Sequence, residues 1–180
     1  MELQVLTGPG DAGALHVRGA GVADHALLVA LWRRSVEATH AFLAPGDVDE
    51  IESEVRRALA AAPELWLAGE EGAPAGFLGC TGNHVDMLFV APEFFRRGVG
   101  TALLAHARRL HGPLAVEVNE GNAGARAFYR ARGFVRMGRS PVDSEGRPYP
   151  LLLLRQPGAD AAAREPGHFP AAGTGSAYDE

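Results

Sequence analysis

The stretch FFRRGVGTALL, residues 94–104, combines two aromatic side chains, two arginines and two glycines in its first seven residues and then becomes apolar. N–H groups in the first turn of a helix have no partner within the helix, and the helix dipole adds partial positive charge there. Gly98 and Gly100 lack the Cβ atoms that would hold an anion away from the backbone, while Arg96 and Arg97 add charge that can reach phosphate. We therefore predict a pyrophosphate site at this turn, with a plain tight turn beside two solvated arginines as the alternative.

Two common nucleotide motifs do not explain the turn. The dinucleotide pattern G-x-G-x-x-G is broken because position 103 is leucine, and a P-loop is excluded because the chain contains no lysine. The sequence therefore predicts neither a Rossmann fingerprint nor a P-loop.

The residues around the turn predict a strand at 84–90, a helix at 100–110 and a second strand at 113–118, a unit of the size expected for a crossover between parallel strands. Further elements are expected on both sides of this unit: helices at 25–43, 47–62 and 124–133, and strands at 14–20, 64–70, 75–82, 134–140 and 149–155. This order predicts an α/β fold, in which one sheet carries helices on both faces.

The composition predicts one soluble domain. The 180 residues are 47% apolar with a formal charge of −5, and no apolar run is long enough to cross a membrane. We expect a lead at 1–14, a domain at 15–155 and a disordered tail at 156–180 that is poor in apolar residues. The N-terminus lacks the features of a signal peptide, which favours a cytoplasmic protein.

The charge pattern gives an expectation about partners. All 17 basic residues are arginine, and they are interspersed with acids rather than forming one block, which argues weakly against a nucleic-acid surface. A net acidic domain rather favours a cationic partner. A single cysteine, Cys80, excludes an internal disulfide, and its strand pattern predicts burial rather than a nucleophilic role. The histidines lack metal-ligand spacing, so we expect no metal site.

Two longer stretches carry a family resemblance. MLFVAPEFFRRGVGTALLAHA (87–107) resembles motif A of the GCN5-related N-acetyltransferases (GNAT superfamily), and NAGARAFYRARGF (122–134) resembles their second motif. LWRRSVEATHAFL (31–43), VNEGN (118–122) and GRPYPLLLLR (146–155) are similar to the YjaB-like branch of bacterial acetyltransferases. The resemblance covers residues 15–155 and implies a mostly antiparallel seven-stranded sheet with a central parallel β-α-β cofactor unit.

The resemblance implies acetyl-CoA as co-substrate. Its pantetheine arm is expected in a gap between strands 84–90 and 113–118, with Phe128 packed beneath it, and Asn122 is either a cofactor contact or a helix cap. Phe95 stands where the family has Gln or Arg, so we expect Arg96 or Arg97 to substitute in part. The cofactor-binding residues implied by the family motifs are Leu88, Phe89, Val90, Arg96, Arg97, Gly98, Val99, Gly100 and Thr101.

Tyr129 matches the family's tyrosine that protonates the departing thiolate. A phenol with a pKa of about 10 is protonated at neutral pH and can hydrogen-bond a sulfur whose thiol has a pKa of about 8.5. The acceptor ammonium, with a pKa of about 10.4, must lose a proton before it attacks. Asp86 is the leading candidate for the base and Glu117 the second. The alternatives for either carboxylate are binding of the cationic substrate and a structural hydrogen bond.

The acceptor is expected near the first helix and the loop that follows it. The residues predicted to contact the acceptor are Trp32, Ser35, Thr39, His40 and Glu117, with His40 also an alternative base. We predict an acetyl-CoA-dependent N-acetyltransferase that moves an acetyl group directly to a primary amine, either a protein lysine or a small molecule. The alternative is a non-catalytic acyl-CoA-binding or regulatory module with the same fold. Monomer and homodimer both remain open.

Overall fold

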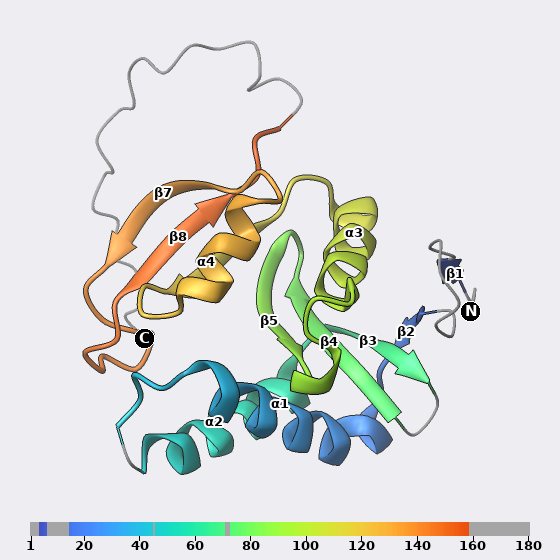
Figure 1. Ribbon diagram of the computed structural model, residues 1–180, viewed down its shortest axis with the longest axis horizontal. Coiled ribbons are helices and arrows are strands. Elements are labelled where there is room, and N and C mark those ends of the chain that lie inside the picture. Colours follow the sequence, from blue (N-terminus) through green and yellow to red (C-terminus); the bar gives the residue numbers. More distant parts are fainter. Residues whose placement is uncertain (1–3, 7–14, 45, 71–72, 159–180) are drawn as a thin grey trace, which may run out of the picture.

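The computed structural model describes residues 4–6, 15–44, 46–70 and 73–158. In this part of the chain, eight strands form one sheet in the order β1-β2-β3-β4-β5-β6-β8-β7 (Figure 1). The strands are β1 (Gln4–Leu6), β2 (Leu15–Gly19), β3 (Glu64–Glu70), β4 (Ala73–Thr81), β5 (His84–Val90), β6 (Ala115–Asn119), β7 (Val135–Ser140) and β8 (Leu151–Arg155). The α-helices are α1 (His25–Thr39), α2 (Asp47–Ala61), α3 (Val99–His111) and α4 (Ala123–Arg130).

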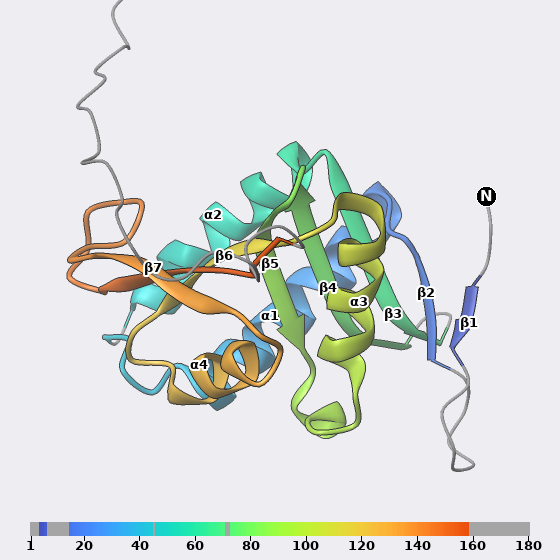
Figure 2. The ribbon, with the colours of Figure 1, turned by 90° about the horizontal axis from the view of Figure 1, so that it is seen from above.

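The helices cover the sheet on both faces (Figure 2). Successive side chains of a strand point to opposite faces of the sheet, and two neighbouring residues of β4 illustrate this. Phe77 packs in a buried cluster with α1 and α2, whereas the next residue, Leu78, packs in a second cluster with α3 and α4. Both side chains are fully buried. The sheet therefore separates two cores. The helix of the β5-α3-β6 unit, α3, lies with α4 on the face opposite α1 and α2.

The centre of the sheet contains its one parallel pair among the described strands. β5 and β6 are joined at His84–Ala115 and Val85–Val116, whereas β5 pairs with β4 along its whole length. The β4–β5 register shifts between Gly79 and Cys80, which leaves Asp86 as an extra residue on β5. Bulges of this kind re-aim side chains and are frequent beside active sites. Beyond Val85, the edge of β5 that faces β6 has no strand partner in the described chain.

The α/β fold and the mostly antiparallel sheet are confirmed, with all seven predicted strands present. The eighth strand, β1, lies within the expected lead, whose residues 1–3 and 7–14 are outside the described part. The first helix ends at Thr39 rather than at residue 43.

The boundary drawn before the tail requires a correction. Gln156 is only 5% exposed, and its backbone N–H donates to the Leu114 carbonyl at 2.8 Å. Its side-chain Oε1 accepts from Leu114 N at 3.2 Å, and its Nε2 donates to the Arg132 carbonyl at 3.1 Å. Gln156 therefore belongs to the domain, while residues 159–180 of the expected tail lie outside the described residues.

Candidate active site

Residues 92–101, which follow β5 and include the first three residues of α3, are here called the anion turn. It contains a 3₁₀ helix at Pro92–Phe94, after which α3 begins at Val99 with Gly98 at its N-cap. The first helical bond is donated by Ala102 N to Gly98 O at 2.9 Å. The N–H groups of residues 99–101 therefore have no partner within the helix, and an anion fits there because it supplies the missing acceptors.

The two glycines of the anion turn are required for different reasons. Gly98 adopts a φ of +85°, a left-handed conformation that most side chains disfavour. Gly100 is buried, and a Cβ atom there would lie 3.0 Å from Cζ of Phe128. Gly100 therefore lets α3 approach α4 closely, with the Phe128 ring packed against this position.

The predicted arginines of the turn lie on its outside. Arg96 and Arg97 are exposed, and Arg97 places its guanidinium 5.7 Å from the centroid of the Phe94 ring. Arg96 has a φ of +63°. The sequence did not point to Arg132, which follows α4 and reaches the side chain of Thr101 at the start of α3. Asn122 caps α4, because its Oδ1 accepts from Ala125 N at 2.9 Å.

Tyr129 lies in the core on the α3 and α4 face, in the same buried cluster as Val85 and Val116 of the short β5–β6 ladder. Its ring packs edge-on against Phe128 and Phe134, with centroids 5.2 and 5.1 Å apart. Burial raises the pKa of Tyr129 above its usual value, so the phenol is protonated at neutral pH. Within the described residues its hydroxyl has no hydrogen-bond partner, which leaves it able to donate to a ligand.

Cys80 is also buried, as predicted. Burial raises the pKa of its thiol to about 12, with smaller contributions from the charges of Asp86 and Glu64. A thiol with this pKa is protonated at neutral pH and is a poor nucleophile.

A cavity of about 460 Å³, here called the large cavity, opens on the α1 and α2 face of the sheet. Its lining comes from α1 and the loop after it, from α2, β5 and β6, and from the β7–β8 loop with the start of β8. Of the residues predicted to contact the acceptor, Trp32 and His40 line it, and the candidate base Asp86 does so as well. Lining residues that sequence reasoning missed include Phe42, Glu54, Arg147 and Tyr149.

The β7–β8 loop is fixed to α2 by charged and polar contacts. Both terminal nitrogens of Arg147 donate to the Glu54 carboxylate, at 2.9 and 2.8 Å, and Nε donates to Asp143 at 2.7 Å. The Tyr149 hydroxyl donates to Asp47 and accepts from Ala44 N at 3.0 Å. These contacts hold one wall of the large cavity in place.

Asp86 projects from the bulge in β5. Its Oδ2 accepts from the Thr81 hydroxyl at 2.8 Å, and its Oδ1 lies 2.8 Å from Nδ1 of His84. An ionised carboxylate only accepts hydrogen bonds, so Nδ1 of His84 carries a proton in this pair. The side chain keeps 35% of its surface exposed and is accessible to a substrate or water.

Ser35 and Thr39 orient His40 rather than lining the large cavity themselves. The Thr39 hydroxyl donates to the Ser35 carbonyl at 2.7 Å and also lies 2.7 Å from Nδ1 of His40. A hydroxyl has one proton to donate, so it accepts from Nδ1–H and leaves Nε2 as the free acceptor. Burial lowers the pKa of His40, which keeps the ring neutral at pH 7. Glu117 is exposed on β6 and is not among the residues that line the cavity.

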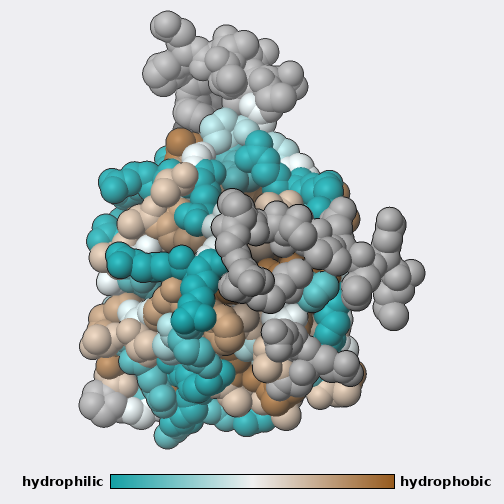
Figure 3. Space-filling view, turned by 45° about the vertical axis from the view of Figure 1, so that its right-hand side comes forward, coloured by the Kyte–Doolittle hydropathy of each residue, from teal (hydrophilic) through white to brown (hydrophobic). Residues whose placement is uncertain are grey.

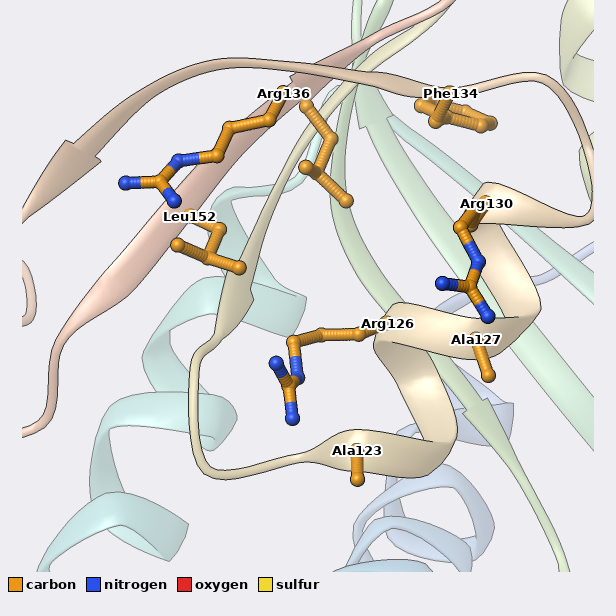
Figure 4. Close-up of a pocket in the computed structure, with 8 residues that line it drawn as sticks. Ala123, Arg126, Ala127, Arg130, Phe134, Arg136 and Leu152 are labelled. Carbon is orange, nitrogen blue, oxygen red and sulfur yellow. The ribbon is translucent and has the colours of Figure 1, made fainter.

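A second cavity of about 320 Å³ lies between α4 and strands β7 and β8 (Figure 4). Arg126 and Arg130 of α4 and Arg136 of β7 stand around it, over a floor that includes Phe134 and Leu152. The three guanidinium groups point in different directions (Figure 4). A cation would be repelled here, so the large cavity is the better candidate for an amine.

In the face shown in Figure 3, hydrophobic areas are small and interrupted by hydrophilic side chains. Among the described residues, no group of three or more His, Cys, Asp or Glu side chains could hold a metal ion. No helix in the described ranges is both long and apolar enough to span a bilayer.

Comparison with known proteins gives consistent matches. A family model described as an acetyltransferase (GNAT) domain matches residues 34–149. The peptidyl-lysine N-acetyltransferase YjaB of Salmonella typhimurium is 46% identical over 131 residues, covering 72% of this chain and 90% of that protein. YjaB of Escherichia coli is 47% identical over 133 residues, covering 73% and 90%. The solution structure of apo YjaB from Escherichia coli has a TM-score of 0.74 and 43% identity, covering 81% of this chain and 99% of that one.

Proposed function

The chain belongs to the GNAT acetyltransferase family, and on this premise we propose that its acceptor is the side-chain amine of a lysine in a protein or peptide. The enzyme is an N-acetyltransferase that uses acetyl-CoA, which when bound supplies the acetyl group as a thioester. Two YjaB proteins with 46% and 47% identity are named for peptidyl-lysine acetylation, which supports the choice of acceptor.

The main observation in support of the proposal is that β5 contributes to the wall of the large cavity. Asp86, Met87 and Phe89 line the cavity, and they belong to the part of β5 beyond Val85. In this part, the edge that does not pair with β4 has no strand partner among the described residues. An extended ligand paired along that edge would end beside a cavity with carboxylates and aromatic rings on its walls. The aliphatic stem of a lysine suits the aromatic rings, and its ammonium suits the carboxylates.

The cofactor side of the site has donors that fit a diphosphate. We assign the N–H groups of Val99, Gly100 and Thr101 to the phosphates and the free edge of β5 at residues 88–90 to the pantetheine arm. Phe128 supports this turn from below. These assignments follow the family motifs, and the unpaired donors in the turn support them.

Two groups around the large cavity can take the proton of the acceptor ammonium. Asp86 is held by hydrogen bonds from Thr81 and His84 and faces the cavity as a carboxylate. His40 lines the same cavity as a neutral ring. We assign the base role to Asp86, directly or through a water molecule, with His40 as the competing candidate. Tyr129 donates its phenolic proton to the departing thiolate.

The test is a thiol-release assay with acetyl-CoA and two peptides that differ at one residue. The first peptide is blocked at its N-terminus and contains one lysine, and the second has arginine instead. We expect turnover of the lysine peptide and none of the arginine peptide, with the acetyl group located on the lysine by mass spectrometry. Turnover of spermidine with no turnover of any lysine peptide would exclude a protein acceptor.

A further inference from the structure

The two arginines of the anion turn, Arg96 and Arg97, are exposed, and no contact in the described chain fixes either of them at the first turn of α3. Phe95 is 37% exposed and carries no charge, and Arg97 stacks over Phe94. Arg132 is different, because it comes from the end of α4 and contacts α3 at its first turn. Thirty-one residues separate Arg132 from its partner Thr101.

Three contacts fix the Arg132 side chain. The guanidinium carbon lies 3.6 Å from the centroid of the Phe128 ring, and Nη1 donates to the Phe128 carbonyl at 2.8 Å. Nε donates to the Thr101 hydroxyl at 3.1 Å, and Nη2 contacts the same oxygen. The backbone at this position is held by Gln156, which donates to the Arg132 carbonyl at 3.1 Å. The charge is therefore positioned before any ligand arrives.

We propose that Arg132 is the cationic side chain of the diphosphate site, acting both directly and through the Thr101 hydroxyl. The proposal rests on the proposed function, which assigns the cofactor phosphates to the start of α3. It extends that function by adding a residue outside the anion turn to the phosphate contacts.

The hydrogen-bond inventory supports this role. A guanidinium has five N–H groups, and the contacts of Arg132 use three of them, so two remain for phosphate oxygens. Thr101 accepts from Arg132 and has no acceptor for its own proton among the described residues, so its O–H is also free to donate. No carboxylate pairs with Arg132 in the described chain, and its positive charge is therefore available to an anion.

Packing also ties Arg132 to the glycine turn. The guanidinium of Arg132 lies over the Phe128 ring, and Cζ and Cε2 of the same ring are the atoms that a Cβ at Gly100 would meet. The same ring thus sets the distance of α4 from α3 and the place of the charge. A leucine at position 132 would keep contact with the ring but remove both the charge and the two bonds to Thr101.

The experiment compares Arg132→Leu with wild type by isothermal titration calorimetry, using coenzyme A and pantetheine as probes. Pantetheine contains the thiol arm but no phosphate. We expect the Arg132→Leu variant to bind coenzyme A about tenfold to a hundredfold more weakly, as for the loss of hydrogen bonds between charged groups, with pantetheine affinity unchanged. The dependence of coenzyme A affinity on salt should also become weaker.

Arg130→Leu is the matched control, because Arg130 is the last residue of α4, two positions before Arg132, and is exposed and lines the second cavity. It should bind both probes as wild type does. Equal coenzyme A affinity in wild type and Arg132→Leu, or an equal loss for both probes, would overturn the role of Arg132. A wild-type protein that binds pantetheine and not coenzyme A would instead remove the phosphate assignment of the proposed function.

Discussion

The anion turn and the large cavity differ in what holds them in shape. The turn is a short continuous segment whose proposed ligand groups are backbone N–H groups, placed by Gly98 and the start of α3. The cavity is assembled from five separate parts of the chain and depends on side-chain contacts such as that between Arg147 and Glu54. We therefore expect substitutions that crowd the backbone of the anion turn to weaken cofactor binding. Substitutions that break side-chain contacts around the large cavity should instead weaken acceptor binding.

The largest expected effect comes from Gly100→Val. The new side chain would press on the Phe128 ring, where a Cβ alone lies at 3.0 Å, and would crowd the free N–H groups. We expect cofactor-induced stabilisation, about 2.7 kcal/mol for wild type at a hundredfold excess over Kd, to be lost in a thermal shift assay. The free protein should also be destabilised by about 1–3 kcal/mol through overpacking.

Gly98 provides the matched comparison, because a Cβ there would meet no atom within 4 Å. Gly98→Asn should keep cofactor binding, since asparagine tolerates a positive φ, whereas Gly98→Val should lose it. If Gly100→Val retained the full ligand-induced shift, the backbone of the anion turn would not be the phosphate site.

Tyr129→Phe should have the next largest effect. It keeps the ring contacts and removes a hydroxyl that has no partner in the described residues, so melting temperature and cofactor affinity should stay the same. We expect kcat to fall by about tenfold to a few hundredfold, because the hydroxyl acts as charge develops on sulfur. Steady-state kinetics at saturating acetyl-CoA measure this, and wild-type kcat in the variant would remove the general-acid role.

Tyr149→Phe makes the same chemical change on the acceptor side. It removes the bonds to Asp47 and to Ala44 N that hold the β7–β8 loop. We expect the KM for the peptide to rise by about threefold to tenfold, with kcat and coenzyme A affinity changed little. A fall in coenzyme A affinity equal to the change in peptide KM would contradict the separation of the two regions.

The smallest effect concerns pH. Burial lowers the pKa of His40, so the unfolded chain takes up a proton more readily than the folded one below about pH 6.5. The contribution of His40 to the free energy of unfolding should be fully present above that pH and should decrease as the pH falls below it. His40→Gln should reduce the loss between pH 7.5 and 5.5, measured by urea unfolding. His106 has a pKa lowered by burial too, so part of the slope should remain. If the unfolding free energy of His40→Gln changed with pH as steeply as that of wild type, the pKa of His40 would not be lowered by folding.

The sequence predicted those features that depend on residues close together in the chain. The glycine turn into α3 at Gly98 and Gly100 and the cap at Asn122, one of the two roles predicted for that residue, are local, because dihedral angles and capping bonds involve residues a few positions apart. Arg132 was missed because its partner is 31 residues away, and Arg147 because Glu54 is 93 residues away. The pattern of charges contains no information on such pairing.

Two further features depend on how an element pairs with its neighbours or where it ends, which its own sequence does not determine. Asp86 was predicted as a candidate base, but the bulge that aims it results from the β4–β5 register. Ser35 and Thr39 were correctly placed on one helix face by their spacing. Their bonding to His40 depends on how α1 ends at Thr39, four residues before the predicted end.

The two-pair ladder between β5 and β6 has a consequence for how the domain opens. It divides the described sheet into a five-stranded part, β1 to β5, and a three-stranded part, β6, β8 and β7. Regions joined by few backbone bonds open at low free-energy cost and exchange their amide protons quickly. A ligand paired along β5 would act as a missing strand between the two parts. Cofactor binding would then join two cooperative units into one, and amide protection would spread across the sheet rather than stay local to the ligand.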